Sequence, residues 1–175
     1  KQTSLAIFDL IADAEAKIHG VPKDSVHFHE VGAVDSLVDI IGTALCLEYL
    51  EIERIVSSSL PLGKGTVASQ HGILPVPAPA TLAILAEVPV YGCGIPAEMI
   101  TPTGAAIIKT LASDFGDLPQ MTIEKIGYGA GSRQLEERPN VLRVVLGSMQ
   151  ETQARPDDVL MIETCIDDMN PEIFG

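Results

Sequence analysis

Two histidines and three carboxylates near the start of the chain are the residues best suited to hold a metal ion. His27 and His29 are separated by one residue, and Glu30, Asp35 and Asp39 follow within ten residues. In an extended segment the two histidine side chains project to the same face, because side chains alternate along a strand. Imidazole nitrogen and carboxylate oxygen together suit zinc, nickel, iron or manganese. The pattern therefore predicts a metal site.

The same residues also fit a purely structural role. Histidine is a frequent buried donor as well as a metal ligand. Asp35 could cap the helix that follows, with Asp39 in its first turn opposing the helix dipole. That helix, expected over residues 35–50, is apolar on nearly every side, so we expect it to be buried. A buried carboxylate at Asp39 must be paired, hydrogen-bonded or coordinated, and spacing alone leaves both interpretations open.

Two further segments carry candidate metal ligands. His71 precedes a glycine and a proline-rich turn, where it could be a third ligand or a general base, or simply a solvated loop residue. A second group of oxygen-bearing side chains follows an expected strand near the end of the chain. These oxygens suit Mg²⁺ or Mn²⁺ with nucleotide phosphates, or else cap a helix that starts at a proline. The group consists of Asp167, Asp168, Asn170 and Glu172.

A helix start near residue 101 is a candidate anion site. Thr101 is a cap residue, a proline follows at the first helical position, and Thr103 and Gly104 complete the turn. The free N–H groups and the dipole of such an end bind phosphate or carboxylate. Plain capping explains the same pattern.

A glycine-rich segment over residues 127–133 is a second candidate. Its backbone N–H groups could form an anion nest, with a cation at its end. The segment lacks the ending of a P-loop, so a flexible hairpin loop is an equally good interpretation. The residues concerned are Gly129, Gly131 and Arg133.

Composition limits the classes of function. The chain has 175 residues with 46% hydrophobic and 4% aromatic content, so its core must be aliphatic. The net charge of −13 argues against a nucleic acid or an anionic membrane surface as partner. Three widely spaced cysteines indicate neither a disulfide framework nor a zinc knuckle, and reduced thiols fit a cytoplasmic protein. Because the chain begins at Lys1, we expect it to be a piece of a longer protein.

The order of expected elements predicts an α/β or α+β fold, in which helices pack on a mixed sheet. Helices are expected at 4–18, 35–50, 79–87 and 101–115, and extended segments at 26–29, 54–60, 66–74, 121–127, 141–146 and 159–166. Residues 1–147 form the expected main domain, whose own amino-terminal part is absent. Residues 148–157 are an expected linker. Residues 158–175, with their strand, are the expected start of a carboxy-terminal domain.

Five segments, spread over nearly the whole chain, resemble one family, the nickel insertases of nickel-pincer cofactor biosynthesis (the LarC family). They are residues 27–36 (HFHEVGAVDS), 71–80 (HGILPVPAPA), 101–105 (TPTGA), 125–131 (KIGYGAG) and 167–172 (DDMNPE). Because the segments are distinctive and ordered, chance agreement is improbable.

The resemblance implies a lyase-class enzyme, a nickel chelatase. It would insert nickel into pyridinium bisthiocarboxylic acid mononucleotide, using CTP with Mn²⁺ or Mg²⁺. The product serves lactate racemase and related enzymes. The first segment and His71 would handle nickel, the threonine helix start and the glycine-rich segment would bind substrate, and the last segment would bind nucleotide and divalent cation. We also expect a homo-oligomer.

Two departures from the family limit what this chain can do. The family's amino-terminal segment is missing, and so is most of the carboxy-terminal domain, which is associated with CTP. We therefore expect the isolated chain to be inactive. Two alternatives stay open: a module that binds or delivers nickel without catalysis, and a metal-dependent hydrolase, which the other four segments do not match.

Overall fold

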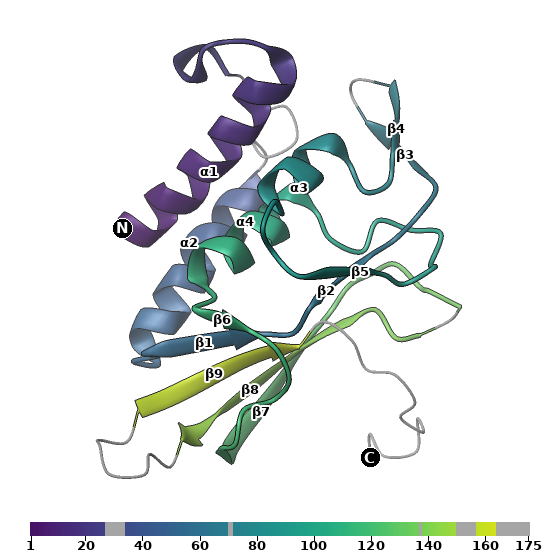
Figure 1. The fold of residues 1–175 in the computed structure, drawn as a ribbon. Coiled ribbons are helices and arrows are strands. Elements are labelled where there is room, and N and C mark those ends of the chain that lie inside the picture. The colour runs from purple at the N-terminus through teal and green to yellow at the C-terminus, as the bar shows by residue number, and fades with distance from the viewer. Residues whose placement is uncertain (27–33, 70–71, 137, 150–156, 164–175) are drawn as a thin grey trace. The chain divides into compact units, whose positions relative to one another are not determined.

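The computed structural model describes residues 1–26, 34–69, 72–136 and 138–149, together with the backbone of 157–163. The chain divides into two compact units, the first formed by residues 1–52 and 59–112 and the second by residues 53–58 with those from 113 onward. Figure 1 shows that the helices belong to the first unit and the longer strands to the second. The predicted mixture of helices with mixed sheets is confirmed.

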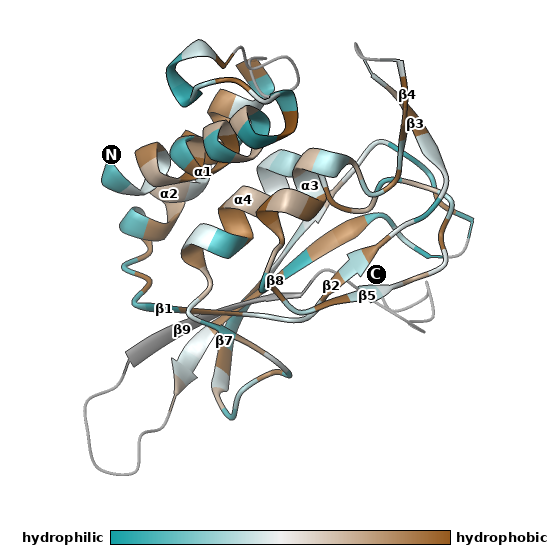
Figure 2. Cartoon of the chain, turned by 45° about the horizontal axis from the view of Figure 1, so that its top comes forward, coloured by the Kyte–Doolittle hydropathy of each residue, from teal (hydrophilic) through white to brown (hydrophobic). Residues whose placement is uncertain are grey.

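Among the described residues of the first unit, the helical part consists of four α-helices and a short 3₁₀ helix. They are α1 (Gln2–His19), η1 (Lys23–Ser25), α2 (Val34–Tyr49), α3 (Pro79–Ile84) and α4 (Pro102–Leu111). Helix α1 contacts the other three α-helices, and α2 also contacts α4. The hydropathy colouring of Figure 2 shows polar and apolar residues in bands along α1, as expected for a helix with one buried side.

Glycine ends α1 as its position predicts. Gly20 has a φ of 63°, in the left-handed region that favours glycine, and the helix stops there. Its backbone N–H and that of Val21 both point back to the carbonyl oxygen of Ala16. Lys23 then donates to Asp9 (2.6 Å) and Asp13 (2.8 Å), which ties η1 to α1.

Two small pairs of strands are also present in the part of the first unit that the structure describes. Strand β2 (Leu60–Leu62) runs parallel to β5 (Val90–Gly92), and β3 (Thr66–Ser69) runs antiparallel to β4 (Gly72–Pro75). The core of this unit is aliphatic, as composition predicts. Its most deeply buried large side chains are Ile7, Ile11, Ile40, Leu60 and Ile84.

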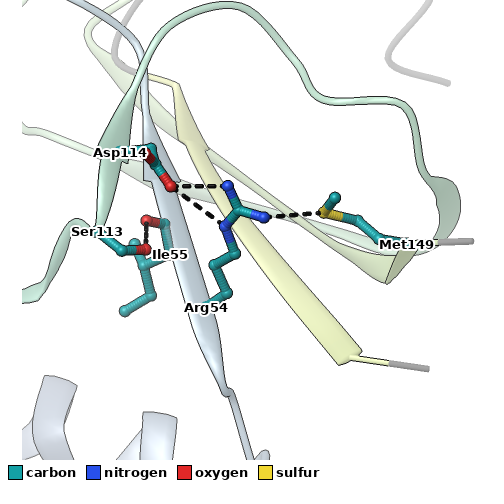
Figure 3. Close-up of polar contacts among 5 residues, drawn as sticks. All are labelled: Arg54, Ile55, Ser113, Asp114 and Met149. Carbon is teal, nitrogen blue, oxygen red and sulfur yellow. Dashed lines mark hydrogen bonds and ion pairs between the residues drawn. The ribbon is translucent and has the colours of Figure 1, made fainter. Parts of the chain in front are cut away.

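Among its described residues the second unit has a five-stranded sheet. The strands are β1 (Arg54–Ser57), β6 (Asp114–Phe115), β7 (Thr122–Ala130), β8 (Val141–Met149) and β9 (Asp157–Glu163). Their order is β6-β1-β9-β8-β7, with β1 parallel to both neighbours and β7, β8 and β9 antiparallel in succession. Arg54 on β1 lies against Asp114, with its Nη2 2.7 Å from Oδ2, and its Nη1 lies 3.9 Å from the sulfur of Met149 (Figure 3).

Several expected elements differ from the structure because distant pairing overrides local pattern. The strand expected at 54–60 is two strands in different units, β1 and β2. The helix expected to reach residue 115 ends at Leu111. The backbone N–H and hydroxyl of Ser113 both donate to the carbonyl oxygen of Ile55 (Figure 3), and residues 114–115 join the sheet as β6. Strands β5 and β6 carry no clear signal in the sequence.

Both ends of the expected linker, residues 148–157, belong to strands. Ser148 and Met149 are the end of β8, and they pair with Asp158 and Asp157 of β9. Strand β9, expected to open a carboxy-terminal domain, lies between β1 and β8 in the sheet. The two compact units therefore do not divide at the boundary that was expected between residues 147 and 158. That boundary stays a prediction for the longer protein.

Candidate functional site

The amino-terminal ends of α2 and α4 meet at a buried pair of hydroxyl groups. Thr103, in the first turn of α4, donates from its Oγ1 to the Oγ of Ser36, in the first turn of α2, at 3.4 Å. The two residues are 9% and 6% exposed. The positive ends of two helix dipoles thus lie beside each other, an arrangement that favours a bound anion.

Helix α4 begins as its sequence predicts. Thr101 is the N-cap, and its Oγ1 accepts a hydrogen bond from the backbone N–H of Gly104 at 3.2 Å. Pro102 occupies the first helical position, where its missing N–H costs nothing. The cap residue is exposed while Thr103 behind it is buried. The predicted capping is confirmed, and the exposed end leaves room for an anion.

The two carboxylates in the first turns of α2 are exposed, although Asp39 was expected to be buried. Asp35 lies in the first helical turn, and its Oδ1 accepts from the N–H of Ser36 at 2.8 Å. Asp39 is also exposed. The prediction that α2 is buried on all sides is wrong for this chain, because α1 and α4 cover one side of it and only Ser36 and Ile40 are buried. Asp39 therefore needs no buried partner, and both carboxylates are accessible to a metal ion.

Several predicted site residues lie outside the described residues. They are His27, His29, Glu30, His71, Asp167, Asp168, Asn170 and Glu172. In the part of the chain that the structure describes, no three His, Cys, Asp or Glu side chains come together in a way that could hold a metal. The predicted metal site stays a prediction, with Asp35 and Asp39 as its described members.

The first part of the glycine-rich segment is not the loop that its composition predicts, because residues 127–130 belong to β7, whereas residues 131–133 lie outside the strands. Gly129 lies within β7, opposite Leu142 of β8. The N–H of Gly131 donates to the carbonyl oxygen of Asn140 at 2.9 Å, and the Asn140 amide donates to the carbonyl oxygen of Arg133 at 3.1 Å. Strand pairing therefore takes up backbone groups that an anion nest would need. The role of Gly129, Gly131 and Arg133 in binding stays a prediction.

The substrate-binding set predicted from the sequence is divided between the two units. Thr101, Thr103 and Gly104 belong to the first unit, while the glycine-rich segment belongs to the second. Sequence reasoning missed Ser36, which the structure places beside Thr103. The available signal was a small hydroxyl residue one position after an aspartate at a helix start, a pattern that ordinary capping also produces.

The fold and these groups define a mixed α/β protein with paired helix starts suited to an anion and with accessible carboxylates just after a histidine segment. The chain belongs to the nickel insertion protein family, whose model, described as nickel insertion protein, matches residues 1–175. None of the helices in the described ranges combines the length and hydrophobicity needed to cross a membrane.

Related proteins agree over the whole chain. A putative nickel insertion protein of Citrifermentans bemidjiense is 54% identical over 175 residues. Pyridinium-3,5-bisthiocarboxylic acid mononucleotide nickel insertion proteins of Acetivibrio thermocellus and Geobacillus kaustophilus are 52% and 50% identical. All of this chain is covered, but only 45%, 43% and 44% of those proteins, so the chain spans less than half of their length. No solved structure matches.

Proposed function

We propose that this chain is part of an enzyme that inserts nickel into pyridinium-3,5-bisthiocarboxylic acid mononucleotide, making a nickel-pincer cofactor. The observation that carries this proposal is the match of all 175 residues to the family, together with two relatives named for that reaction at 50% and 52% identity. Nickel is here a substrate of the reaction.

In this proposal the histidine segment and α2 handle the incoming nickel. His27, His29 and Glu30 precede α2 in the sequence, and Asp35 and Asp39 lie on its first two turns with exposed carboxylates. Imidazole is a suitable ligand for nickel, and carboxylates can complete or orient the set. We assign His71 to the same group as a further ligand or a neighbour of one.

The start of α4 is the proposed site for the phosphate of the mononucleotide. Thr101 presents its hydroxyl at an exposed helix end, where its Oγ1 also accepts from the backbone N–H of Gly104, and the buried contact of Thr103 with Ser36 holds that end against α2. A phosphate at this position gains hydrogen bonds and the helix dipole. The anion would then lie near the start of α2, the helix that carries Asp35 and Asp39 and that follows the histidine segment in the sequence.

The remaining steps depend on polypeptide beyond this chain. We propose a lyase-class reaction that uses CTP with Mn²⁺ or Mg²⁺, in which Asp167, Asp168, Asn170 and Glu172 contribute oxygen ligands beside the nucleotide-binding domain. The cofactor would be delivered to lactate racemase or a related enzyme by a cytoplasmic homo-oligomer. A module that only delivers nickel is the second candidate, because the chain covers less than half of its relatives.

A chimera tests this proposal. This chain would replace the matched 45% of the Citrifermentans bemidjiense protein, and nickel insertion would be followed by mass spectrometry of the mononucleotide product in the presence of CTP and Mn²⁺. We expect product from the chimera, none from the isolated chain, and a loss of at least tenfold with His27→Ala/His29→Ala, about 1.4 kcal/mol of transition-state stabilisation. His19→Gln is the matched control, because His19 pairs with Glu15 and is not a predicted ligand.

Each possible result separates the candidates. Full activity in the double histidine variant would contradict the assigned nickel ligands. Insertion by the isolated chain would contradict the dependence on further domains. Nickel binding by the chain without product from a folded, CTP-binding chimera would favour the delivery module.

Thr101→Ala should raise the KM for the mononucleotide more than it lowers kcat, because Thr101 is proposed to bind the phosphate of the mononucleotide. An unchanged KM would contradict a phosphate site at the start of α4.

A further inference from the structure

One side of α2 is an exposed apolar surface. The opposite side packs through Ser36 and Ile40 against the other helices. The exposed side, which we call the α2 face, consists of Val34, Leu37, Val38, Ile41, Leu45 and Tyr49. Val34, Val38 and Tyr49 are 75%, 63% and 87% exposed. Apolar residues that recur every three or four positions form one continuous stripe, and such a patch marks an interaction surface.

The charged residues on the rim of the α2 face and within it are all acidic. At 100° per residue, Asp35 and Asp39 lie on one side of the stripe, and Glu48 lies within it, between Leu37 and Ile41. The helix contains no Lys, Arg or His between Val34 and Tyr49. A partner that pairs with this rim must carry basic residues. Two copies of the chain would oppose carboxylate to carboxylate, on a chain whose net charge is already −13.

A glycine at the edge of the α2 face leaves space for close approach. Gly42 is four residues from Val38 and three from Leu45, so it borders the stripe. A Cβ at this position would meet nothing within 4 Å among the described residues. Glycine inside a helix costs about 1 kcal/mol relative to alanine, and the described residues around Gly42 do not crowd this position.

We propose that the α2 face is the docking surface for the polypeptide that the relatives carry outside the matched portion, presented as an apolar element with basic residues on its rim. More than half of each relative lies outside that portion. This polypeptide is part of the same chain as the matched portion in those relatives, and it is large enough to cover the α2 face. Docking would bury the exposed side of a helix whose sequence is apolar nearly all round. This proposal does not depend on whether the chain binds nickel.

Hydrogen exchange compares the face with and without this partner. The isolated chain and the chimera with the Citrifermentans bemidjiense protein would be followed by mass spectrometry of peptides from α2. We expect exchange at least tenfold slower in the chimera, equivalent to about 1.4 kcal/mol of added protection. If the chimera does not fold, the intact relative and its own matched segment give the same comparison. Equal exchange in both members of the pair would overturn the proposal.

Substitutions identify the surface involved. Val38→Gln and Leu45→Gln should leave the melting temperature of the isolated chain nearly unchanged, because both side chains are exposed and glutamine is a good helix former. In the chimera they should remove the added protection. Ile73→Gln, on β4 at 77% exposure, is the matched control and should not.

Two results would show that the α2 face is covered by something other than the proposed polypeptide. Protection of α2 in a monomeric isolated chain would show that the chain covers its own face. A dimer of the isolated chain that Val38→Gln dissociates in sedimentation would identify a second copy as the occupant. Either result would overturn the proposal.

Discussion

The hydroxyl of Thr103 donates to the hydroxyl of Ser36 across 67 positions of sequence, at 3.4 Å, and both side chains are buried. This contact holds the first turn of α4 against the first turn of α2. It therefore joins the proposed phosphate site to the helix that carries Asp35 and Asp39. The pair therefore helps to position the exposed start of α4 relative to α2.

Removing one member of this pair should destabilise the chain. Ser36→Ala or Thr103→Val alone should lower the free energy of unfolding by about 1–2 kcal/mol, since each leaves a buried hydroxyl without its partner. The double variant should lose less than the sum, because it leaves neither. Urea denaturation measures all three, with exposed Thr66→Val as the control. Strict additivity would contradict a direct interaction.

Gly63 is predicted to be intolerant of any side chain. A Cβ at this position would overlap the backbone carbonyl of Ala97, which cannot move aside as the end of a flexible side chain could. Gly63→Ala should cost about 1–3 kcal/mol in a urea titration. Gly42→Ala in the isolated chain is the opposite case, with open space and a helical backbone, and should stabilise by up to about 1 kcal/mol. Equal effects would mean that local crowding does not decide the outcome.

The ion pairs of Lys23 predict a dependence on pH. The hydrogen bonds that Lys23 donates to Asp13 and then to Asp9 raise the pKa of Lys23 above its ordinary value of 10.5. A raised pKa means that the folded state holds this proton more tightly. Its stabilising effect is therefore complete below pH 10.5 and is lost as pH rises through the higher folded-state pKa.

Thermal denaturation of Lys23→Gln tests this dependence. The variant should melt slightly below the unchanged chain at pH 7, and the difference should shrink in high salt and in strongly alkaline solution. Lys17→Gln is the control, since Lys17 is an exposed lysine on α1 with no ion pair shown among the described residues. A difference that persists unchanged well above pH 10.5 would show that Lys23 acts through packing of its stem.

Local rules predicted the parts of the fold that depend on nearby residues. Gly20 ends α1, and Thr101 caps α4, because capping needs a few neighbouring positions. The rules failed where distant segments compete. Residues 114–115 pair with β1 in place of extending α4, and Gly129 pairs with Leu142 in place of forming a loop.

The sequence predicted the types of residue in the candidate site better than it predicted their burial and their neighbours. The threonine helix start is present, and family membership is confirmed. The burial of Asp39 was predicted wrongly. The apolar pattern of α2 shows that much of the helix surface is hydrophobic, but it does not show which sides of the helix are buried within this chain. Ser36 was missed because its partner Thr103 is distant in sequence.

The central claim is that the histidine segment of this chain binds nickel, and calorimetry tests it most directly. The purified, metal-free chain would be titrated with Ni²⁺ beside the His27→Ala/His29→Ala variant, with His19→Gln as the control. We predict stoichiometric binding by the unchanged chain and by the control, and loss of binding in the double variant. Equal binding by all three, or no binding by any, would contradict a nickel site built by His27 and His29 in this chain.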